Sequence, residues 1–468
     1  MRRLLLIMGL VLLTLASCQK RSGNFPPDNT DVRLDSTNLP IVWIEVGGDS
    51  IKRDTRINAR MKIIHNGDGR LNYADTIAHP GQHKDYEGYI ALRHRGNSTY
   101  NDSPKKAYSL RTLAEPMWRD VTTKKKVKLL GMGRDNNWAL LAPYADKSMM
   151  RDLLGFEISR PWMEYVPQGR YCELILDGTY YGVYILSEVV SKGRHRLDLL
   201  SPGTSGDELT GSYLMEVDSD DDVAYVSKHH PVTADGTPLL DRRILFQYKS
   251  PDYEKLEYEQ RTYINRRIDL MENALAKGNY RKHIDVMSFI DYQLAIELGH
   301  NVDGYRLSGK FYKQRDSEDP RFKMALWDMN LAYGNCNRLE GWRTDTWMYQ
   351  NNDLMYREGE TYLIPFWWQR LNSDPQYTAM LKARWAEYRR SNLREDRVMA
   401  LVDSLAGVLT SHGAEYRNSQ AWPRWGVWVW CNQYVARDFN DEVAHLKQWL
   451  LERIAWMDRE LGYETNEE

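Results

Sequence analysis

The sequence predicts an α+β fold with a β-rich first half and a helical C-terminal part. Two observations carry this prediction. Residues 39–112 and 170–190 alternate apolar and polar positions and are rich in β-branched and aromatic residues, as is typical of strands. After about residue 360, apolar residues instead recur every three or four positions, as they do on one face of a helix. We therefore expect most strands to precede most helices.

The start of the chain has the layout of an export signal. Two arginines precede an apolar run over residues 4–15, and the small residues Ala16 and Ser17 come directly before Cys18. The run is shorter than the roughly 20 apolar residues of a membrane span. Its ending resembles the lipobox of bacterial lipoproteins, so we expect cleavage after residues 1–17 and lipid on Cys18. An ordinary signal peptide with a chance cysteine is the alternative.

The residues that follow predict a tether. Residues 18–38 are rich in Ser, Asn, Asp and Pro, a composition that does not build a core, so we expect a flexible segment. Gln19 follows Cys18, with no aspartate there to indicate retention in the inner membrane. We therefore expect a membrane-anchored lipoprotein of the outer membrane, with its body facing the periplasm or the cell surface.

Composition excludes some functions and leaves others open. A net charge of -2 gives no overall basic field, which argues against nucleic-acid binding. With Cys18 lipidated, Cys172, Cys336 and Cys431 remain, and the sequence does not choose a disulfide among them. The 16 Trp and 30 Tyr against 8 Phe suit binding clefts as well as large cores.

Several elements within the chain have clear local signals. Asp177-Gly178 between two apolar runs predicts a β-hairpin turn. Apolar spacing predicts helices over residues 146–160, 254–278 and 285–298, and residues 324–327 form a short strand candidate. A last apolar stripe ends at Leu461 and predicts one long helix, with Asn440 or Asp441 as its cap.

Two familiar patterns fail on inspection. The segment from Gly304 to Lys310 has P-loop spacing, but Phe311 stands where a metal-binding Ser or Thr is needed, and a helix precedes the segment. The acidic residues 218–222 resemble an EF-hand start, but Val223 occupies the required glycine position. We interpret the first as chance and the second as an acidic loop.

A set of ordered motifs does form a recognisable pattern. The motifs are RGNST (95–99) with PKKAY (104–108), DKSMMR (146–151), GVYILSE (182–188), NVDGY (301–305), WDMNLAYG (327–334), LNSDP (371–375) and RW (384–385). Together they resemble the CotH kinase family, the spore-coat-type atypical protein kinases. The resemblance implies an atypical protein-kinase-like core, here over residues 113–340, between the β-rich region 39–112 and a helical region 341–468. It also implies binding of ATP with Mg²⁺ or Mn²⁺ and phosphate transfer to Ser or Thr of surface or secreted proteins.

Phosphoryl transfer needs a cation over the phosphates, a carboxylate that orients that cation, metal ligands and a carboxylate for the acceptor hydroxyl. Lys106 lies in a strand-like run after a polar turn, and Glu188 ends an apolar strand, so we expect these two to pair. Asp303 begins a loop after a helix and is the expected catalytic residue. Asp328 follows an apolar strand and is the expected metal ligand. Taken singly, each of these residues also fits a solvated face, a turn or a structural role.

Three further cations are candidates for phosphate contact. Arg95 belongs to the first motif, and Lys147 and Arg151 belong to the second. For Lys147 and Arg151, a salt bridge at the start of a helix is an equal alternative.

Two positions depart from the pattern of an active kinase. Ser308 stands five residues after Asp303, where protein kinases place a metal-binding Asn. Asn330 replaces the second metal-site Asp and removes one negative charge, which should weaken metal binding. Asn301 and Asn335 are alternative ligands. An inactive kinase-like scaffold for adhesion, glycan binding or surface assembly is therefore the second hypothesis, since ATP is also scarce outside the cytoplasm.

Overall fold

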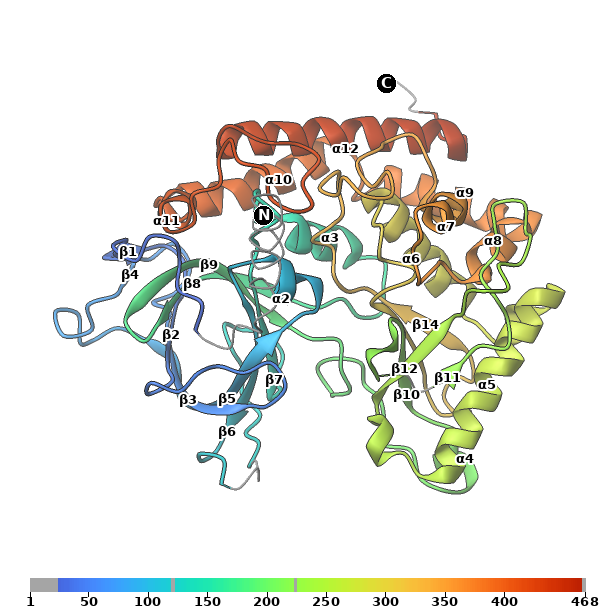
Figure 1. Cartoon of the computed structure of the whole chain (residues 1–468), viewed down its shortest axis with the longest axis horizontal. Coiled ribbons are helices and arrows are strands. Elements are labelled where there is room, and N and C mark those ends of the chain that lie inside the picture. The colour runs from blue at the N-terminus through green and yellow to red at the C-terminus, as the bar shows by residue number, and fades with distance from the viewer. Residues whose placement is uncertain (1–23, 119–122, 223–224, 465–468) are drawn as a thin grey trace, which may run out of the picture.

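The computed structural model describes residues 24–118, 123–222 and 225–464, which form two lobes joined by C-terminal helices (Figure 1). The predicted signal peptide and Cys18 lie outside the described residues. Within the described ranges, no helix is both long and apolar enough to span a membrane.

The first lobe is a closed β-barrel with strand order β2-β3-β5-β6-β7-β9-β8. The strands are β2 (Ile41–Glu45), β3 (Ile57–Ile64), β5 (Lys84–Arg95), β6 (Ala107–Leu113), β7 (Asn137–Leu141), β8 (Gly169–Leu176) and β9 (Thr179–Glu188). Neighbours are antiparallel except β2 and β8, whose parallel pairing closes the barrel. The predicted hairpin turn is confirmed: Asp177 and Gly178, both with positive φ, join β8 to β9.

The tether prediction is wrong over residues 24–38, which pack on the barrel. The Asn24 side chain accepts a hydrogen bond from Ile51 N at 2.9 Å, and Asn29 N donates to Ala421 O at 3.2 Å. Leu34 is buried in the barrel core, and β1 (Ser36–Thr37) pairs with β4 (Asn72–Tyr73). A few well-placed anchors are enough to order this segment, although its average composition is that of a linker.

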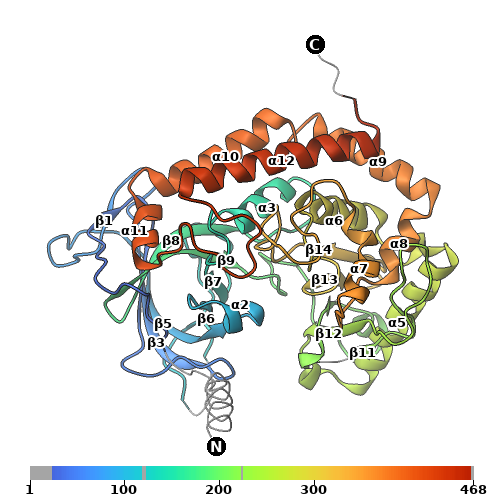
Figure 2. The same ribbon diagram turned by 45° about the horizontal axis from the view of Figure 1, so that its top comes forward.

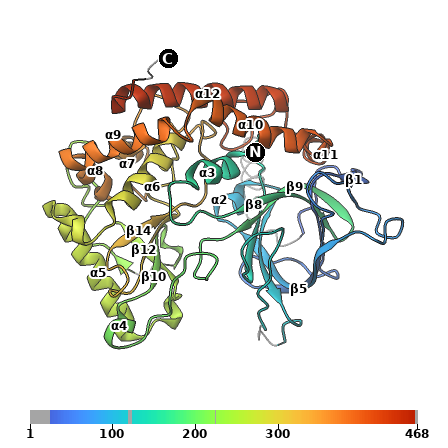
Figure 3. The same ribbon diagram turned by 180° about the vertical axis from the view of Figure 1, so that it is seen from behind.

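The second lobe is built on a five-stranded sheet in the order β11-β12-β10-β13-β14. The strands are β10 (Tyr213–Val217), β11 (Tyr225–Val226), β12 (Leu245–Ser250), β13 (Gly309–Lys313) and β14 (Phe322–Ala325). Its helices are α4 (Gly206–Leu209), α5 (Tyr258–Lys277), α6 (Val286–Gly299), α7 (Asn352–Arg357), α8 (Phe366–Asn372) and α9 (Pro375–Arg389). Helix α6 is buried almost all round and forms the centre of this lobe (Figure 3).

The two lobes are bridged from above by α10 (Glu395–Thr410), α11 (Ala414–Ala421) and α12 (Phe439–Leu461), as Figure 2 shows. On α11, the side chain of Asn418 accepts hydrogen bonds from Val183 N on β9 and from Lys105. Helix α12 packs against α6 and α10. The C-terminal helices therefore hold the barrel and the second lobe in one fixed arrangement.

The α+β prediction is confirmed, and most predicted elements are present at slightly different bounds. The helix expected at 146–160 is α3 (Arg151–Ser159), and the long C-terminal helix is capped by Asp438, not by Asn440 or Asp441. The predicted boundary at residue 112 falls inside the barrel, because β7, β8 and β9 come after it. Long-range strand pairing decides that boundary, and composition does not reveal it.

Candidate functional site

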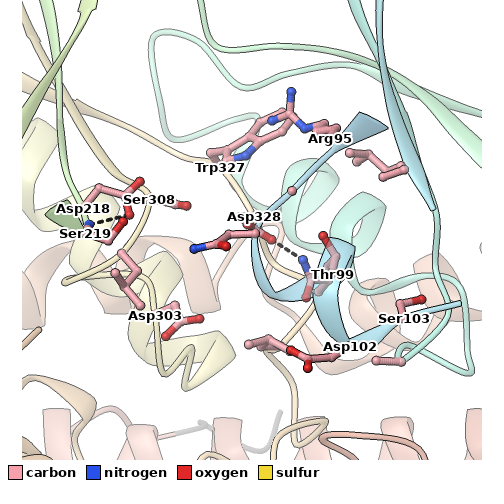
Figure 4. Close-up of a pocket in the computed structure, with 18 of the residues that line it drawn as sticks. Arg95, Thr99, Asp102, Ser103, Asp218, Ser219, Asp303, Ser308, Trp327 and Asp328 are labelled. Atoms are coloured by element: carbon pink, nitrogen blue, oxygen red, sulfur yellow. Dashed lines mark hydrogen bonds between the residues drawn. The ribbon is translucent and has the colours of Figure 1, made fainter. Parts of the chain in front are cut away.

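A cleft of about 1060 Å³ lies between the outer face of the barrel and the five-stranded sheet. The barrel side comes from the ends of β5 and β7, and the other side comes from β10, β12, β13 and two loops, residues 301–308 and 327–331. Figure 4 shows Asp303 and Asp328 on these loops facing the same space, with Arg95 on the barrel side. The cleft therefore brings together Arg95, Asp303, Asp328 and Asn330 from the predicted set.

Asp303 is positioned by the loop that follows α6. His300 ends the helix with a φ of 44°, and the Asn301 side chain then links two loops. Its Oδ1 accepts from Asp303 N at 3.1 Å, and its Nδ2 donates to Asp328 O at 2.8 Å. Asn301 therefore ties the loop of Asp303 to the loop of Asp328.

Arg306 holds the Asp303 carboxylate in place. Its guanidinium donates to Asp303 Oδ1 at 2.9 Å and to Glu360 Oε2 at 2.7 Å, and the arginine side chain is only 3 % exposed. The Asp303 side chain is 29 % exposed, so one side of the carboxylate stays open to the cleft. This arrangement orients the carboxylate toward the cleft.

Asp328 is held in an uncommon backbone conformation beside other acids. Its φ is 62°, a value that residues other than glycine seldom adopt, and such strain is found most often at functional sites. Burial, and then the charge of Asp303, raises the pKa of Asp328 to about 6. Burial and the charge of Asp328 raise the pKa of Asp152 to about 8, although Met329 N donates to its carboxyl at 2.8 Å.

The crowded carboxyls suit a cation, because a positive ion would relieve their repulsion. The donor set of Asp328, Asp303 and the amide of Asn330 consists of oxygens, which Mg²⁺ and Mn²⁺ prefer. In the described residues no group of three or more His, Cys, Asp or Glu side chains is arranged to hold a metal. Asn330 donates its amide N–H to Asp328. The Asn335 side chain donates to Asn330 O and accepts a hydrogen bond from Asn432, so Asn335 does not serve as a substitute ligand.

Arg95 reaches the same space from the barrel. Its guanidinium lies 4.7 Å from the centre of the ring of Trp327, the residue that directly precedes Asp328 in the sequence. Burial lowers the pKa of Arg95, and the nearby charge of Asp328 partly offsets this. Arg95 is therefore the predicted phosphate-contacting residue that the structure does place in the cleft.

The predicted Lys106–Glu188 pair is not formed. Lys106 Nζ donates to the carbonyls of Tyr100 and Ser103, both at 2.5 Å, and so closes the turn around α2 (Ser98–Asp102). Glu188 pairs instead with Arg196 at 2.5 Å. The nearer cations and carbonyls in the fold satisfy both groups, and neither lines the cleft.

Lys147 and Arg151 also lie outside the cleft lining. Lys147 Nζ donates to Val427 O at 2.5 Å, and burial lowers its pKa to about 8. Arg151 is buried between Asp146 at 2.6 Å and Glu442 of α12 at 2.8 Å. The salt-bridge alternative at the start of α3 is therefore what the structure supports for Arg151.

The cleft also contains charged residues that were not predicted. Lys310 on β13 pairs with Glu216, which faces it on β10, and Lys249 on β12 reaches Glu216 at 2.8 Å. Burial alone would raise the pKa of Glu216, but the two lysines outweigh it and lower that pKa to about 2. The neighbouring Asp218 has a pKa raised to about 6, by burial and then by Glu216. In the sequence, this part of the cleft is marked by the P-loop-like segment 304–310 and the acidic segment 218–222, which fail as a P-loop and as an EF-hand.

The three cysteines within the described residues are buried and free. Cys172 lies in the barrel core, whereas the thiols of Cys336 and Cys431 share a hydrogen bond and Cys336 lines the cleft.

A cleft between a β-lobe and a mainly helical lobe, with two aspartates on adjoining loops, defines the class of kinase-like proteins. The family model described as CotH kinase protein matches residues 92–457. The chain therefore belongs to the CotH kinase family, as its motifs predicted. A comparison with curated proteins found no match.

Proposed function

We propose that this protein binds ATP with a divalent cation in the cleft and transfers the terminal phosphoryl group to a Ser or Thr hydroxyl. The acceptor is a surface or secreted protein. The observation that supports this most is the placement of Asp303 and Asp328, which Asn301 holds on two adjoining loops that face one cleft.

Each residue has a role that follows from its surroundings. Asp303, oriented by its ion pair with Arg306, accepts the proton of the acceptor hydroxyl. Asp328 and Asn330 hold Mg²⁺ or Mn²⁺, and Arg95 offsets phosphate charge from the barrel side. When bound, the cation neutralises charge on the phosphates.

Nucleotide titration tests this proposal on purified residues 19–468. ATP with Mg²⁺ or Mn²⁺ should raise the melting temperature, and phosphate should be incorporated into a mixture of casein and surface proteins. Asp303→Asn and Asp328→Asn should each reduce incorporation by about 10²-fold or more. The control is Asp68→Asn, which changes an exposed aspartate of the barrel. Absence of both a thermal shift and transfer would contradict the proposal.

Attachment through lipid on Cys18 is part of the same proposal. It is supported by the basic start, the short apolar run and the small residues before that cysteine. Cys18→Ser should move the protein from the outer-membrane fraction to the soluble fraction and abolish labelling with radioactive palmitate. Unchanged fractionation and labelling would contradict the anchor.

An inactive scaffold is the second candidate, because Asn330 stands where a second acid is expected and donates a hydrogen bond to Asp328. The large number of tryptophans gives little support to a glycan-binding scaffold. Eight of the 16 tryptophans are buried, namely Trp138, Trp162, Trp327, Trp367, Trp368, Trp385, Trp422 and Trp449. A glycan array without hits, together with active transfer, would remove this candidate.

A further inference from the structure

The outer face of the barrel carries a row of arginines that begins at the cleft. Arg93 and Arg95 are two residues apart on β5, so their side chains point to the same face. Arg111 lies on the neighbouring strand β6. Arg56, just before β3, donates to backbone carbonyls of β5 and β6 at 3.0 and 2.9 Å. We call Arg56, Arg93, Arg95 and Arg111 the arginine row.

The positive charge of this row is only partly offset by the protein, through the nearby charges of Asp328 and Asp252. In the part of the chain that the structure describes, none of the four guanidinium groups forms an ion pair with a carboxylate. Arg56 bonds to neutral oxygens, and Arg111 donates to Asn137 Oδ1 at 3.1 Å. Arg93 Nε is buried without a hydrogen-bond partner. Such a group of like charges is unfavourable unless an anion joins it.

The pKa of Arg56 reflects its burial first and the neighbouring arginines second. Burial, followed by the charges of Arg111, Arg93 and Arg95, lowers the pKa of Arg56 to about 9. The group still carries its charge at neutral pH, so the row presents several positive charges at once. Arginine binds carboxylates and phosphates through two parallel hydrogen bonds, which makes these anions the fitting ligands.

The positive surface continues beyond the cleft. Arg93 and Arg95 line the cleft, whereas the other end of the row meets the connection between β6 and β7. That connection carries four exposed lysines, Lys124, Lys125, Lys126 and Lys128, which we call the lysine segment. Lys125 N donates to Thr112 O at 2.9 Å, so the segment starts beside β6. In Figure 1, β6 and this connection reach the lower end of the barrel.

We propose that the arginine row and the lysine segment bind an acidic stretch of the acceptor polypeptide. This rests on the proposed function, because the stretch would direct a nearby Ser or Thr to Asp303. Asp, Glu and phosphorylated residues supply the matching anions.

The length of the surface favours a chain over a nucleotide. From Arg95 to the level of Arg111, which faces Ala91, β5 advances by about 13 Å at roughly 3.3 Å per residue, and the lysine segment extends it further. A nucleotide with its phosphates at Asp328 would use Arg95, the nearest member, and leave the others unoccupied. An extended acidic polypeptide uses the remaining members of the row together with the lysine segment and leaves Arg95 to the nucleotide.

Direct binding tests this inference without requiring catalysis. The probe is a fluorescein-labelled peptide of alternating Glu and Ser, compared by anisotropy with a Gln and Ser peptide and with single-stranded DNA of equal charge. The full mature chain should bind the Glu peptide most tightly, with affinity that falls as salt rises. Arg93→Met with Arg111→Met should weaken this binding by about tenfold or more. Replacing Lys124, Lys125 and Lys126 by Ser, on an exposed connection, should weaken it as well without affecting folding.

The matched control is Arg390→Met with Arg397→Met, two exposed arginines on the distant helices, which should change binding less than twofold. Equal loss in the control, equal binding of DNA, or no binding of the Glu peptide would overturn the inference. Loss of ATP binding in Arg93→Met with Arg111→Met, with peptide binding intact, would assign the row to the nucleotide and overturn it too. Intact peptide binding without any phosphate transfer would instead contradict only the proposed function.

Discussion

Two regions of this protein handle arginine in opposite ways. At the start of α3, Arg151 is enclosed by Asp146 and Glu442, so its charge is fully used within the fold. On the outer face of the barrel, Arg93 and Arg95 have no carboxylate at ion-pair distance among the described residues. Both regions carry the same residue type in motifs of the same family. The difference teaches that an arginine already neutralised is structural, whereas one left open is available to a ligand.

The carboxylates show the same contrast. Glu188 is closed off by Arg196 and accepts a further hydrogen bond from Gly133 N at 3.1 Å. Asp303 is held on one side only, and Asp328 lies beside Asp303 with the charges of Arg95 and Lys310 nearby but, among the described residues, without an ion pair. The cleft therefore contains charged groups that remain available to a ligand or a cation.

Removal of Arg151 has the largest expected effect and tests the distinction between closed and open arginines directly. Arg151→Met leaves Asp146 and Glu442 buried without their cation, and we expect the free energy of unfolding to fall by about 3–5 kcal/mol. Urea unfolding followed by tryptophan fluorescence measures this. Arg95→Met is the matched variant and should cost far less, since no carboxylate loses its ion pair. Equal losses in the two variants would refute the distinction between closed and open arginines.

A pH series tests the crowding of the acids in the cleft. The raised pKa of Asp152 means that the folded state keeps a proton that the unfolded state loses near pH 4. Stability should therefore fall as pH rises from about 4 to about 8, by roughly 5 kcal/mol at most from this group, since each pKa unit corresponds to about 1.4 kcal/mol. Asp152→Asn, which keeps the acceptor for Met329 N, should flatten this slope. A slope that is unchanged in Asp152→Asn would show that Asp152 is not held protonated.

The smallest expected effect is on the stability of a variant that lacks one arginine of the open row. Arg93→Met removes one charge from the arginine row and breaks no described hydrogen bond, so the free protein should become slightly more stable, by about 0.5 kcal/mol. Thermal unfolding at low and high salt measures it, and the gain should shrink at high salt. Destabilisation at both salt concentrations would mean that the Arg93 charge is already satisfied.

The sequence predicted the local features of the site and misjudged its pairings. Asp303 and Asp328 were identified from the family motifs NVDGY and WDMNLAYG, and both lie in the cleft. Lys106 was expected to meet Glu188, but the carbonyl of Ser103, three residues away, satisfies it. The Lys310–Glu216 pair was not predicted, because these two cross-strand neighbours are 94 positions apart in the chain.

By itself, the sequence determined the family, the α+β order of elements, the β8–β9 hairpin and the two acidic loops. These follow from periodicity, turn residues and short motifs, which depend on neighbours in the chain. The tertiary structure alone decided which cations stay free: one of the two carboxylates that enclose Arg151 comes from Glu442, 291 residues away. Electrostatic pairing depends on distance in space and on burial, and neither is written in local sequence.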